Sequence, residues 1–237
     1  METFLIENVS FLCQKLNYVL QMVTEINLND PKLCAILDGT INLFYEFGIK
    51  NLNMDDISRK LKISKKTLYQ YAKSKEDLIE KLFYYDDMRW ERRISEIIHK
   101  KLNAIDILIH VSIVISEQIA KFDPKLKFEM KKYYESIFYN FMQKKEAHIF
   151  EQISNNIKRG VEEGLYRDNL NIELVAGLYV RNLVDMHNED YCFVENITSE
   201  QVLKAMFENH IRAIATPEGI EYFEKRKSEI TQLNKNN

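Results

Sequence analysis

The residues of this chain that could do chemistry gather in one basic segment, residues 50–75. It holds eight lysines and arginines against Asp55 and Asp56, a local charge of +6. Because the whole chain carries a formal charge of −3, the remaining residues carry −9. A basic patch on an otherwise acidic protein is typical of a surface that follows nucleic-acid phosphates. The alternative is an ordinary solvated pair of helices, because lysine-rich faces are common.

Two short helices around a tight turn must position these basic residues. Asn53 can cap a first helix, and the two aspartates that follow suit the positive end of its dipole. Ser64 can cap a second helix, predicted over residues 65–73. Two short helices joined by so brief a turn must cross steeply, which predicts a helix-turn-helix.

The second of these helices has two distinct faces. Leu68, Tyr71 and Ala72 fall on one arc, which is expected to pack against the core. The opposite arc is free to contact a partner and consists of Lys66, Tyr69, Gln70 and Lys73. With the capping pattern and the tight turn, this division favours DNA binding over a solvated helix pair.

Together these residues resemble the N-terminal signature of the TetR-type transcriptional regulators. The matching motifs are, in order, Phe44 and Gly48, Asn53, Asp56-Ile57, the run from Ile63 to Tyr71, and Ser74-Lys75-Glu76-Asp77-Leu78. Three positions depart from the family pattern: Lys62 and Lys66 replace glycines, and Ala72 replaces an aromatic residue. Lys62 is therefore expected to adopt a left-handed or strained backbone, and Ala72 to leave a smaller core side chain.

The resemblance implies which residues contact DNA and how. Phosphates are expected to be held by Asn53, Ser64, Lys65, Tyr69, Tyr71 and Lys75. Base edges are expected to face Lys66, Thr67 and Gln70. The implied protein is a homodimer, more often a repressor than an activator. It would read a palindromic double-stranded DNA operator and release it when an effector binds.

Composition predicts an all-α protein, because six glycines and three prolines are few for 237 residues. Three scattered cysteines indicate neither a disulfide framework nor a zinc site. The start of the chain lacks the basic residues of a secretory signal, and no apolar run approaches ~18 residues. We therefore expect a cytoplasmic protein with no cofactor and no membrane partner.

Three regions are predicted: an N-terminal helical extension at residues 1–30, a three-helix helix-turn-helix head at 31–78, and a helical ligand-sensing and dimerisation domain at 79–237. A long helix opens near Ser74 and runs toward residue 100. Apolar spacing predicts further helices near residues 103–121, 124–144, 147–163, 171–187, 199–214 and 217–231.

An aromatic helix in the third region suggests an effector pocket, since such pockets are mostly apolar with a few orienting hydroxyls. The candidate lining is Phe128, Met130, Tyr133, Tyr134, Phe138 and Met142. It would accept a small apolar or aromatic effector, although such a stripe is more often plain core. The resemblance places the dimer interface on the last long helices, with Leu174, Leu178, Val202 and Met206 as candidates.

Metal sites and catalytic residues are not expected. Glu96-x-x-His99 has the spacing of a carboxylate-bridged metal motif but lacks the second pair that such a site needs. Asp185, His187, Glu189 and Asp190 stand near a helix end and point in different directions. The chain contains no phosphate-binding glycine loop, no GxSxG and no HExxH.

Two alternatives stay open. The first is a helical protein that binds small molecules and has lost specific DNA recognition, with the changes at Lys62, Lys66 and Ala72 as signs of decay. The second is a helical enzyme built on the same body. The enzyme would need polar groups that converge in a pocket, and the sequence shows no such group.

Overall fold

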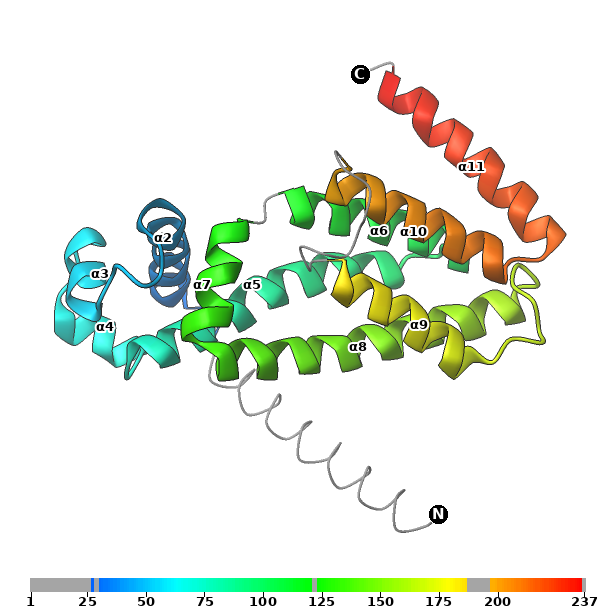
Figure 1. Ribbon diagram of the computed structural model, residues 1–237. Helices are drawn as coiled ribbons and strands as arrows, with labels where there is room; N and C mark the ends of the chain where they lie inside the picture. Colours follow the sequence, from blue (N-terminus) through cyan, green and yellow to red (C-terminus); the bar gives the residue numbers. More distant parts are fainter. Residues whose placement is uncertain (1–26, 28–29, 121–122, 187–196, 236–237) are drawn as a thin grey trace, which may run out of the picture. The chain divides into compact units, whose positions relative to one another are not determined.

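A computed structural model describes residues 27, 30–120, 123–186 and 197–235 of this chain (Figure 1). These residues form ten α-helices, and an isolated antiparallel bridge between Tyr166 and Ala215 is the sole extended pairing among them. The predicted all-helical fold is confirmed. The predicted N-terminal extension lies outside the described residues, apart from Asn27 and Asp30.

The chain divides into two compact units, each of which takes residues from two stretches of sequence. The first unit comprises Met1–Arg89 and Asp123–Lys144, and the second comprises Trp90–Phe122 and Lys145–Asn237. This division differs from the predicted boundary after residue 78, because part of the predicted sensor domain belongs to the first unit. The compact units do not test where the DNA-binding domain ends in function, so its boundary at residue 78 stays a prediction.

The first unit is built from short helices with well-defined ends. It contains α2 (Pro31–Phe47), α3 (Met54–Lys60), α4 (Lys65–Tyr71) and α7 (Pro124–Tyr133), with parts of α5 (Lys75–Ile98) and α8 (Glu135–Glu162). Asp30 begins α2 by accepting hydrogen bonds from the backbone N–H groups of Lys32 and Leu33, at 2.9 and 3.2 Å. Gly48, with φ of 81°, ends the same helix in a conformation that favours glycine.

One apolar core holds the first unit together. Leu37, Ile57 and Leu68 are completely buried, one from each of α2, α3 and α4. Leu78 of α5 and Met130 of α7 complete this core. Each helix of the head therefore contributes an apolar face to a shared interior, which fixes how α3 and α4 cross.

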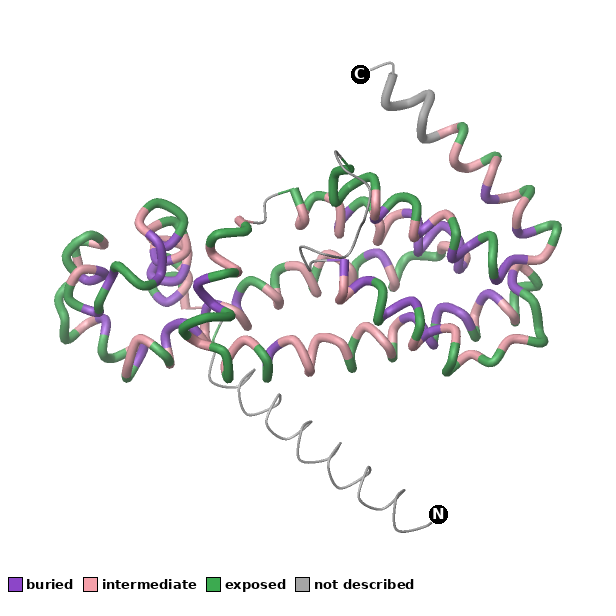
Figure 2. The backbone as a smooth tube through the Cα atoms, in the orientation of Figure 1, coloured by how far each residue is buried: buried purple, intermediate pink, exposed green. Residues whose placement is uncertain are grey.

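The second unit contains α6 (Ala104–Ala120), α9 (Ile172–Asp185), α10 (Ser199–Ile214) and α11 (Pro217–Lys235), with the remainders of α5 and α8. Ile105, Ile157 and Ile211 are completely buried in its main core. Figure 2 shows buried positions recurring on one side of α9 and α10, as expected for amphipathic helices.

A polar contact attaches α11 to α6 within the second unit. Asp106 is 7% exposed, and its carboxylate accepts hydrogen bonds from Tyr222 Oη at 2.6 Å and Arg226 Nε at 2.8 Å. The neighbouring carboxylates of Asp106 and Glu229 raise the pKa of the Arg226 guanidinium. Because the carboxylate is paired, its burial is tolerated, and the start of α11 is held in place.

Two helix predictions were wrong at their junction. A helix over 124–144 and another over 147–163 were expected, but α7 ends at Tyr133 and α8 runs without interruption from Glu135 to Glu162. The break falls at Tyr134, whose φ of −135° and ψ of 39° are not helical. No proline, glycine or capping residue marks this break, and the strong helix formers around Lys144 and Lys145 let α8 continue. No helix among the described residues is long and apolar enough to cross a membrane.

Candidate nucleic-acid interface

The helix α3 begins with the reciprocal cap that its sequence predicts. Asn53 Oδ1 accepts a hydrogen bond from the backbone N–H of Asp56 at 2.9 Å, and Asp56 Oδ2 accepts one from the backbone N–H of Asn53 at 3.2 Å. The Asn53 side-chain oxygen is therefore occupied by the cap, and its amide nitrogen is the group that could reach a phosphate.

The turn between α3 and α4 contains the strained residue that the sequence predicts. Lys62 has φ of 56°, the one positive φ at a non-glycine position in the described residues. The turn is closed by backbone hydrogen bonds, including Ile63 N–H to Ser58 O at 3.0 Å. A left-handed lysine is costly, but its side chain points to solvent and does not disturb the fold.

The helix α4 presents the face that the sequence predicts. Ser64 Oγ accepts a hydrogen bond from the backbone N–H of Thr67 at 3.0 Å, which begins the helix. Leu68 is completely buried, and Ala72 is 1% exposed just after the helix. The exposed side chains are Ser64, Lys65, Lys66, Tyr69 and Gln70, with Thr67 partly exposed. One buried leucine therefore fixes which side chains of α4 face outward.

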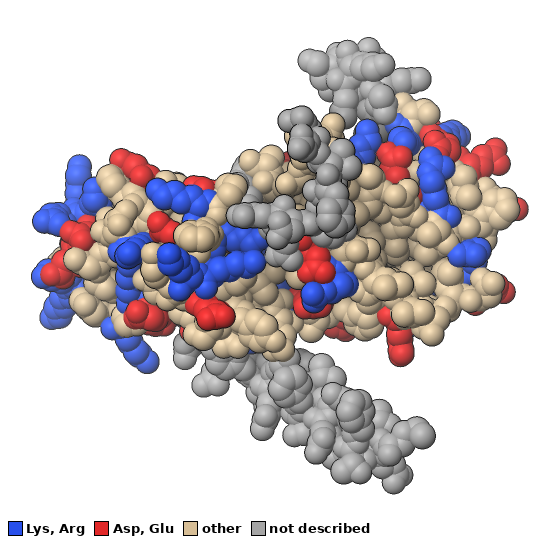
Figure 3. All heavy atoms as spheres, viewed as in Figure 1, with Lys and Arg blue, Asp and Glu red and all other residues tan. Residues whose placement is uncertain are grey.

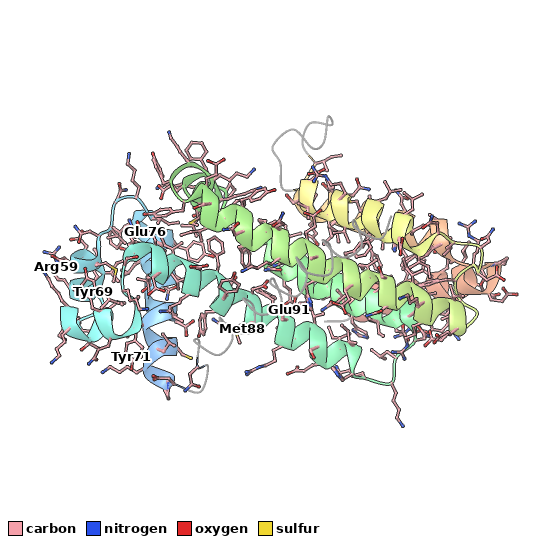
Figure 4. All side chains as sticks on the ribbon, turned by 90° about the horizontal axis from the view of Figure 1, so that it is seen from below. Arg59, Tyr69, Tyr71, Glu76, Met88 and Glu91 are labelled. Atoms are coloured by element: carbon pink, nitrogen blue, oxygen red, sulfur yellow. The ribbon has the colours of Figure 1, made fainter. Side chains whose placement is uncertain are left out.

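Lys65 and Tyr69 lie at the outer surface of the first unit. Lys65 Nζ forms an exposed ion pair with Asp55 Oδ2 at 2.5 Å. A pair of this kind contributes little to stability, so a phosphate can replace the carboxylate. Tyr69 is 48% exposed, and Figure 4 shows it near Arg59.

Tyr71 and Lys75 are half-buried, unlike the other residues that were predicted to contact phosphates. Tyr71 packs partly against the core near the start of α2, and partial burial together with the Asp30 carboxylate raises the pKa of its hydroxyl. Lys75 Nζ donates a hydrogen bond to the backbone O of Ile49 at 2.6 Å. Burial lowers the pKa of the Lys75 ammonium. For Lys75 this geometry favours a role inside the head.

The basic character of the interface survives the pairing of its aspartates. Asp55 pairs with Lys65, and Asp56 pairs with Arg59. Five lysines of the segment are also exposed: Lys50, Lys60, Lys62, Lys66 and Lys73. Figure 3 shows basic side chains gathered around the same end of the first unit. Such a surface attracts a polyanion.

The predicted pocket residues do not come together as one lining. Met130 is 3% exposed in the core of the first unit, and Phe138 packs partly against that core, with its ring centroid 6.4 Å from that of Phe83. Phe128 and Tyr133 are 56% and 39% exposed. Tyr134 packs against the same core, and Met142 is half-buried. All six belong to the first unit, which contains α7 and the start of α8, a placement that periodicity could not reveal.

The predicted dimer residues form two groups in the second unit. Leu174 and Leu178 of α9 are each 59% exposed. Val202 and Met206 of α10 are half-buried and pack partly against the main core. The two leucines are one helical turn apart and make an apolar stripe on the surface of α9.

The first candidate metal site is not assembled, and most of the second lies outside the described residues. His99 Nδ1 lies 2.7 Å from the backbone O of Ser95, within its own helix. His187, Glu189 and Asp190 lie outside the described residues. Among the residues that are described, no group of three or more histidine, cysteine, aspartate or glutamate side chains could hold a metal ion.

Sequence reasoning missed one polar element near this interface. Glu129 of α7 accepts hydrogen bonds from the backbone N–H groups of Ile49 and Lys50, at 2.6 and 3.1 Å. These two residues precede the Asn53 cap in the chain. In the sequence, Glu129 stands out as the one acidic residue among the lysines of 125–132. Nothing in the sequence indicates the two backbone groups that it binds.

Comparison with known proteins gives a sequence match over the same region of the chain. Residues 36–82 match the family described as bacterial regulatory proteins, tetR family. A relative from Bacillus subtilis (strain 168), an uncharacterized HTH-type transcriptional regulator called YvaF, is 25% identical over 188 residues, covering 77% of this chain and 95% of that protein.

Solved structures share the fold. A transcriptional regulator from Cytophaga hutchinsonii aligns with a TM-score of 0.66 at 18% identity, over 79% of this chain and 100% of that one. AibR, solved in complex with isovaleryl coenzyme A and operator DNA, aligns with a TM-score of 0.51 at 16% identity, over 75% of this chain and 96% of that one.

The strained turn generates a test of the head's packing. Lys62→Gly should leave the protein more stable than Lys62→Ala by roughly 1 kcal/mol, because glycine adopts positive φ at little cost. Both changes remove the same charge, so the comparison isolates the backbone. Urea unfolding followed by circular dichroism measures the difference. Equal stability of the two variants would show that residue 62 is not left-handed in solution.

Proposed function

We propose that this chain, which is a TetR-family helix-turn-helix transcriptional regulator, represses transcription as a homodimer bound to a palindromic operator and is released by a small effector. The family match confirms the resemblance inferred from sequence. The family consists of transcriptional regulators, so the expectation of no enzymatic activity is confirmed on the same ground. The protein would act on cytoplasmic DNA.

The observation that carries the proposal is the outward face of α4. Lys66 and Gln70 are exposed on a helix anchored by a completely buried Leu68, and Thr67 lies partly exposed between them. These are the groups that read base edges in a major groove. Ser64, Lys65 and Tyr69 flank them and suit phosphate contacts. We infer that α4 is the recognition helix and that α3, begun by Asn53, supports it against the DNA backbone.

The rival reading, a head that has lost DNA recognition, predicts a damaged core. Ala72 is 1% exposed and fits the core, and Lys62 adopts its left-handed turn with closed hydrogen bonds. Lys66 stands on the exposed face, where it adds positive charge. These observations favour a working head. Selection of bound sequences from random duplex DNA is the direct test, and a palindromic product is expected.

The proposed dimer uses the apolar stripe of α9. Leu174 and Leu178 are 59% exposed, whereas most residues of that size in the second unit are buried or half-buried. Val202 and Met206 of α10 would complete the surface. Two heads related by a two-fold axis would then meet half-sites about 34 Å apart, or a multiple of that distance.

The proposed effector site lies in the second unit, at His210 of α10. Its ring stacks on Tyr179 of α9, with centroids 4.0 Å apart and planes 24° apart. His210 is 8% exposed, and Nε2 has no hydrogen-bond partner among the described residues. Burial lowers the pKa of His210 to about 4, so the ring is neutral at pH 7.

An unpaired buried nitrogen of this kind costs about 1–3 kcal/mol, which a bound hydrogen-bonding group would recover. The surroundings are apolar, with Leu183 and Phe207 in the same core. We therefore retain the small apolar or aromatic effector predicted from sequence and assign its polar anchor to His210. One polar group on an otherwise apolar molecule fits this environment.

Base recognition by α4 can be tested at Gln70. Gln70→Ala should weaken binding to the selected operator by about 1–3 kcal/mol and relax base preference at one position of each half-site. Lys73 is an exposed lysine two residues beyond the end of α4, and Lys73→Ala should weaken all duplexes alike. Fluorescence anisotropy with the operator and single-base variants measures both. Identical losses on every duplex for the two variants would contradict base reading by Gln70.

The dimer interface can be tested at Leu178. Leu178→Glu should give monomers, because a charge in the middle of an apolar interface is poorly tolerated. Ile113→Glu is the matched control, since Ile113 is an exposed apolar residue of α6, 43% exposed, outside the proposed interface. Sedimentation velocity at micromolar concentration should show a dimer for the wild type and the control. A monomeric wild type would contradict the proposal.

The effector site can be tested by replacing the unpaired histidine. His210→Phe keeps a ring that can stack on Tyr179 but removes both nitrogens. Compounds with an apolar body and one hydrogen-bonding group should raise the melting temperature of the wild type, and the variant should bind them about 5- to 30-fold more weakly, a loss of about 1–2 kcal/mol. Operator affinity without effector should not change. Undiminished effector binding by the variant would place the site elsewhere.

A further inference from the structure

The helix α7 belongs to the same compact unit as the DNA-binding head, although residues 72–123 separate it from α4 and it lies in the region predicted to sense ligands. We propose that the outer face of α7 is a second DNA-contact surface, which holds the phosphates that flank the operator. This inference rests on the proposed operator binding and adds a contact that the helix-turn-helix does not supply.

Glu129 fixes α7 to the head. Its carboxylate is 9% exposed and accepts the backbone N–H groups of Ile49 and Lys50 at 2.6 and 3.1 Å. Gly48 makes this approach possible, because a Cβ built there would lie 2.8 Å from Glu129 Oε1. Lys75 Nζ holds the carbonyl of the same Ile49 at 2.6 Å. A charged acceptor with two amide donors forms a strong attachment, so α7 has a defined orientation on the turn before α3.

The attachment leaves a basic face of α7 exposed. With Glu129 and Met130 directed inward, Lys125, Phe128 and Lys132 form one stripe at helical spacing, and all three are exposed. Figure 3 shows lysine and arginine side chains gathered over α7. The helix carries four lysines, and its one acidic side chain, Glu129, is buried against the head. Its outward charge is therefore positive.

Aromatic rings support the lysines of this face. Lys132 Nζ lies 5.3 Å from the ring centroid of Phe128 and 5.5 Å from that of Tyr133. Lys50 Nζ, from the turn before α3, lies 4.8 Å from the same Tyr133 ring. Such contacts are worth about 0.5–1 kcal/mol at exposed sites and restrain the ammonium groups. Two lysines from distant parts of the chain therefore meet at one tyrosine.

Charge and continuity identify the occupant as duplex DNA. Lys50 joins the face of α7 to the basic segment that begins the helix-turn-helix, so the positive surface continues from one to the other. An extended basic surface next to a recognition helix matches the extended row of phosphates beyond a half-site. An isolated small anion would require a closed site, whereas these lysines are open to solvent.

The experiment compares duplexes of two lengths. The first holds only the selected operator, and the second extends it on each side by about one duplex turn, ~10 base pairs. The variant is Lys125→Gln with Lys132→Gln. The matched control is Lys158→Gln with Lys225→Gln, which removes the same charge from exposed positions in the second unit. Fluorescence anisotropy is measured between about 0.05 and 0.2 M salt.

The wild type and the control should bind the long duplex more tightly than the short one. The α7 variant should lose roughly tenfold or more on the long duplex, with a shallower salt dependence by about two units per protomer, and should bind the short duplex as the wild type does. If the α7 variant and the control bind the long duplex equally well, the inference is overturned while operator binding stays intact. An equal loss of affinity by the α7 variant on the long and the short duplex would also overturn it.

Two further outcomes separate the alternatives. A wild type that binds neither duplex would overturn the proposed function, and this inference with it. Vesicles of anionic phospholipid provide the other comparison. If the wild type binds them, and the α7 variant loses vesicle binding but keeps its affinity for the long duplex, the face serves a lipid surface and the DNA assignment is wrong.

Discussion

The burial of Leu68 is the contact on which the DNA-binding arrangement depends. Within α4, whose seven residues are all described, Leu68 alone is buried, and it is completely so. A seven-residue helix has no stability of its own, because helix nucleation costs more than so few hydrogen bonds return. The helix exists because Ser64 caps it and because Leu68 enters a core shared with α2 and α3. Its outward side chains are oriented by that one inward side chain.

The same core explains why a distant helix belongs to the head. Met130 of α7 is 3% exposed among the apolar residues of α2 to α5, and Glu129 beside it binds two backbone N–H groups of the turn before α3. An apolar contact and a charged hydrogen-bonded contact thus act at adjacent positions of one helix. Together they fix both the depth and the rotation of α7, which in turn determines that its lysines are exposed.

The buried polar groups of this chain are not all satisfied to the same extent. In the first unit the buried carboxylate of Glu129 is satisfied by backbone donors, and the Asp106 carboxylate of the second is satisfied by Tyr222 and Arg226. His210 Nε2 has no such partner among the described residues, although it is equally buried. Unpaired buried nitrogens are uncommon in folded proteins because they cost stability without return. A regulator that binds a ligand has a use for such an atom, since the ligand supplies the missing partner.

The sequence by itself determined the features that depend on neighbouring residues. The caps at Asn53 and Ser64, the left-handed Lys62 and the outward face of α4 all follow from interactions within a few residues, and all agree with the structure. Tertiary structure decided the features that depend on distant partners. Periodicity identifies an apolar or basic face but not what covers it, so the sequence could not show that α7 and the start of α8, which carry the aromatic stripe near 128–142, pack in the first unit. The break at Tyr134, the inward turn of Lys75 and the partner of Glu129 have the same origin. Each results from packing between segments far apart in the chain, whose energies exceed the local preferences that a sequence displays.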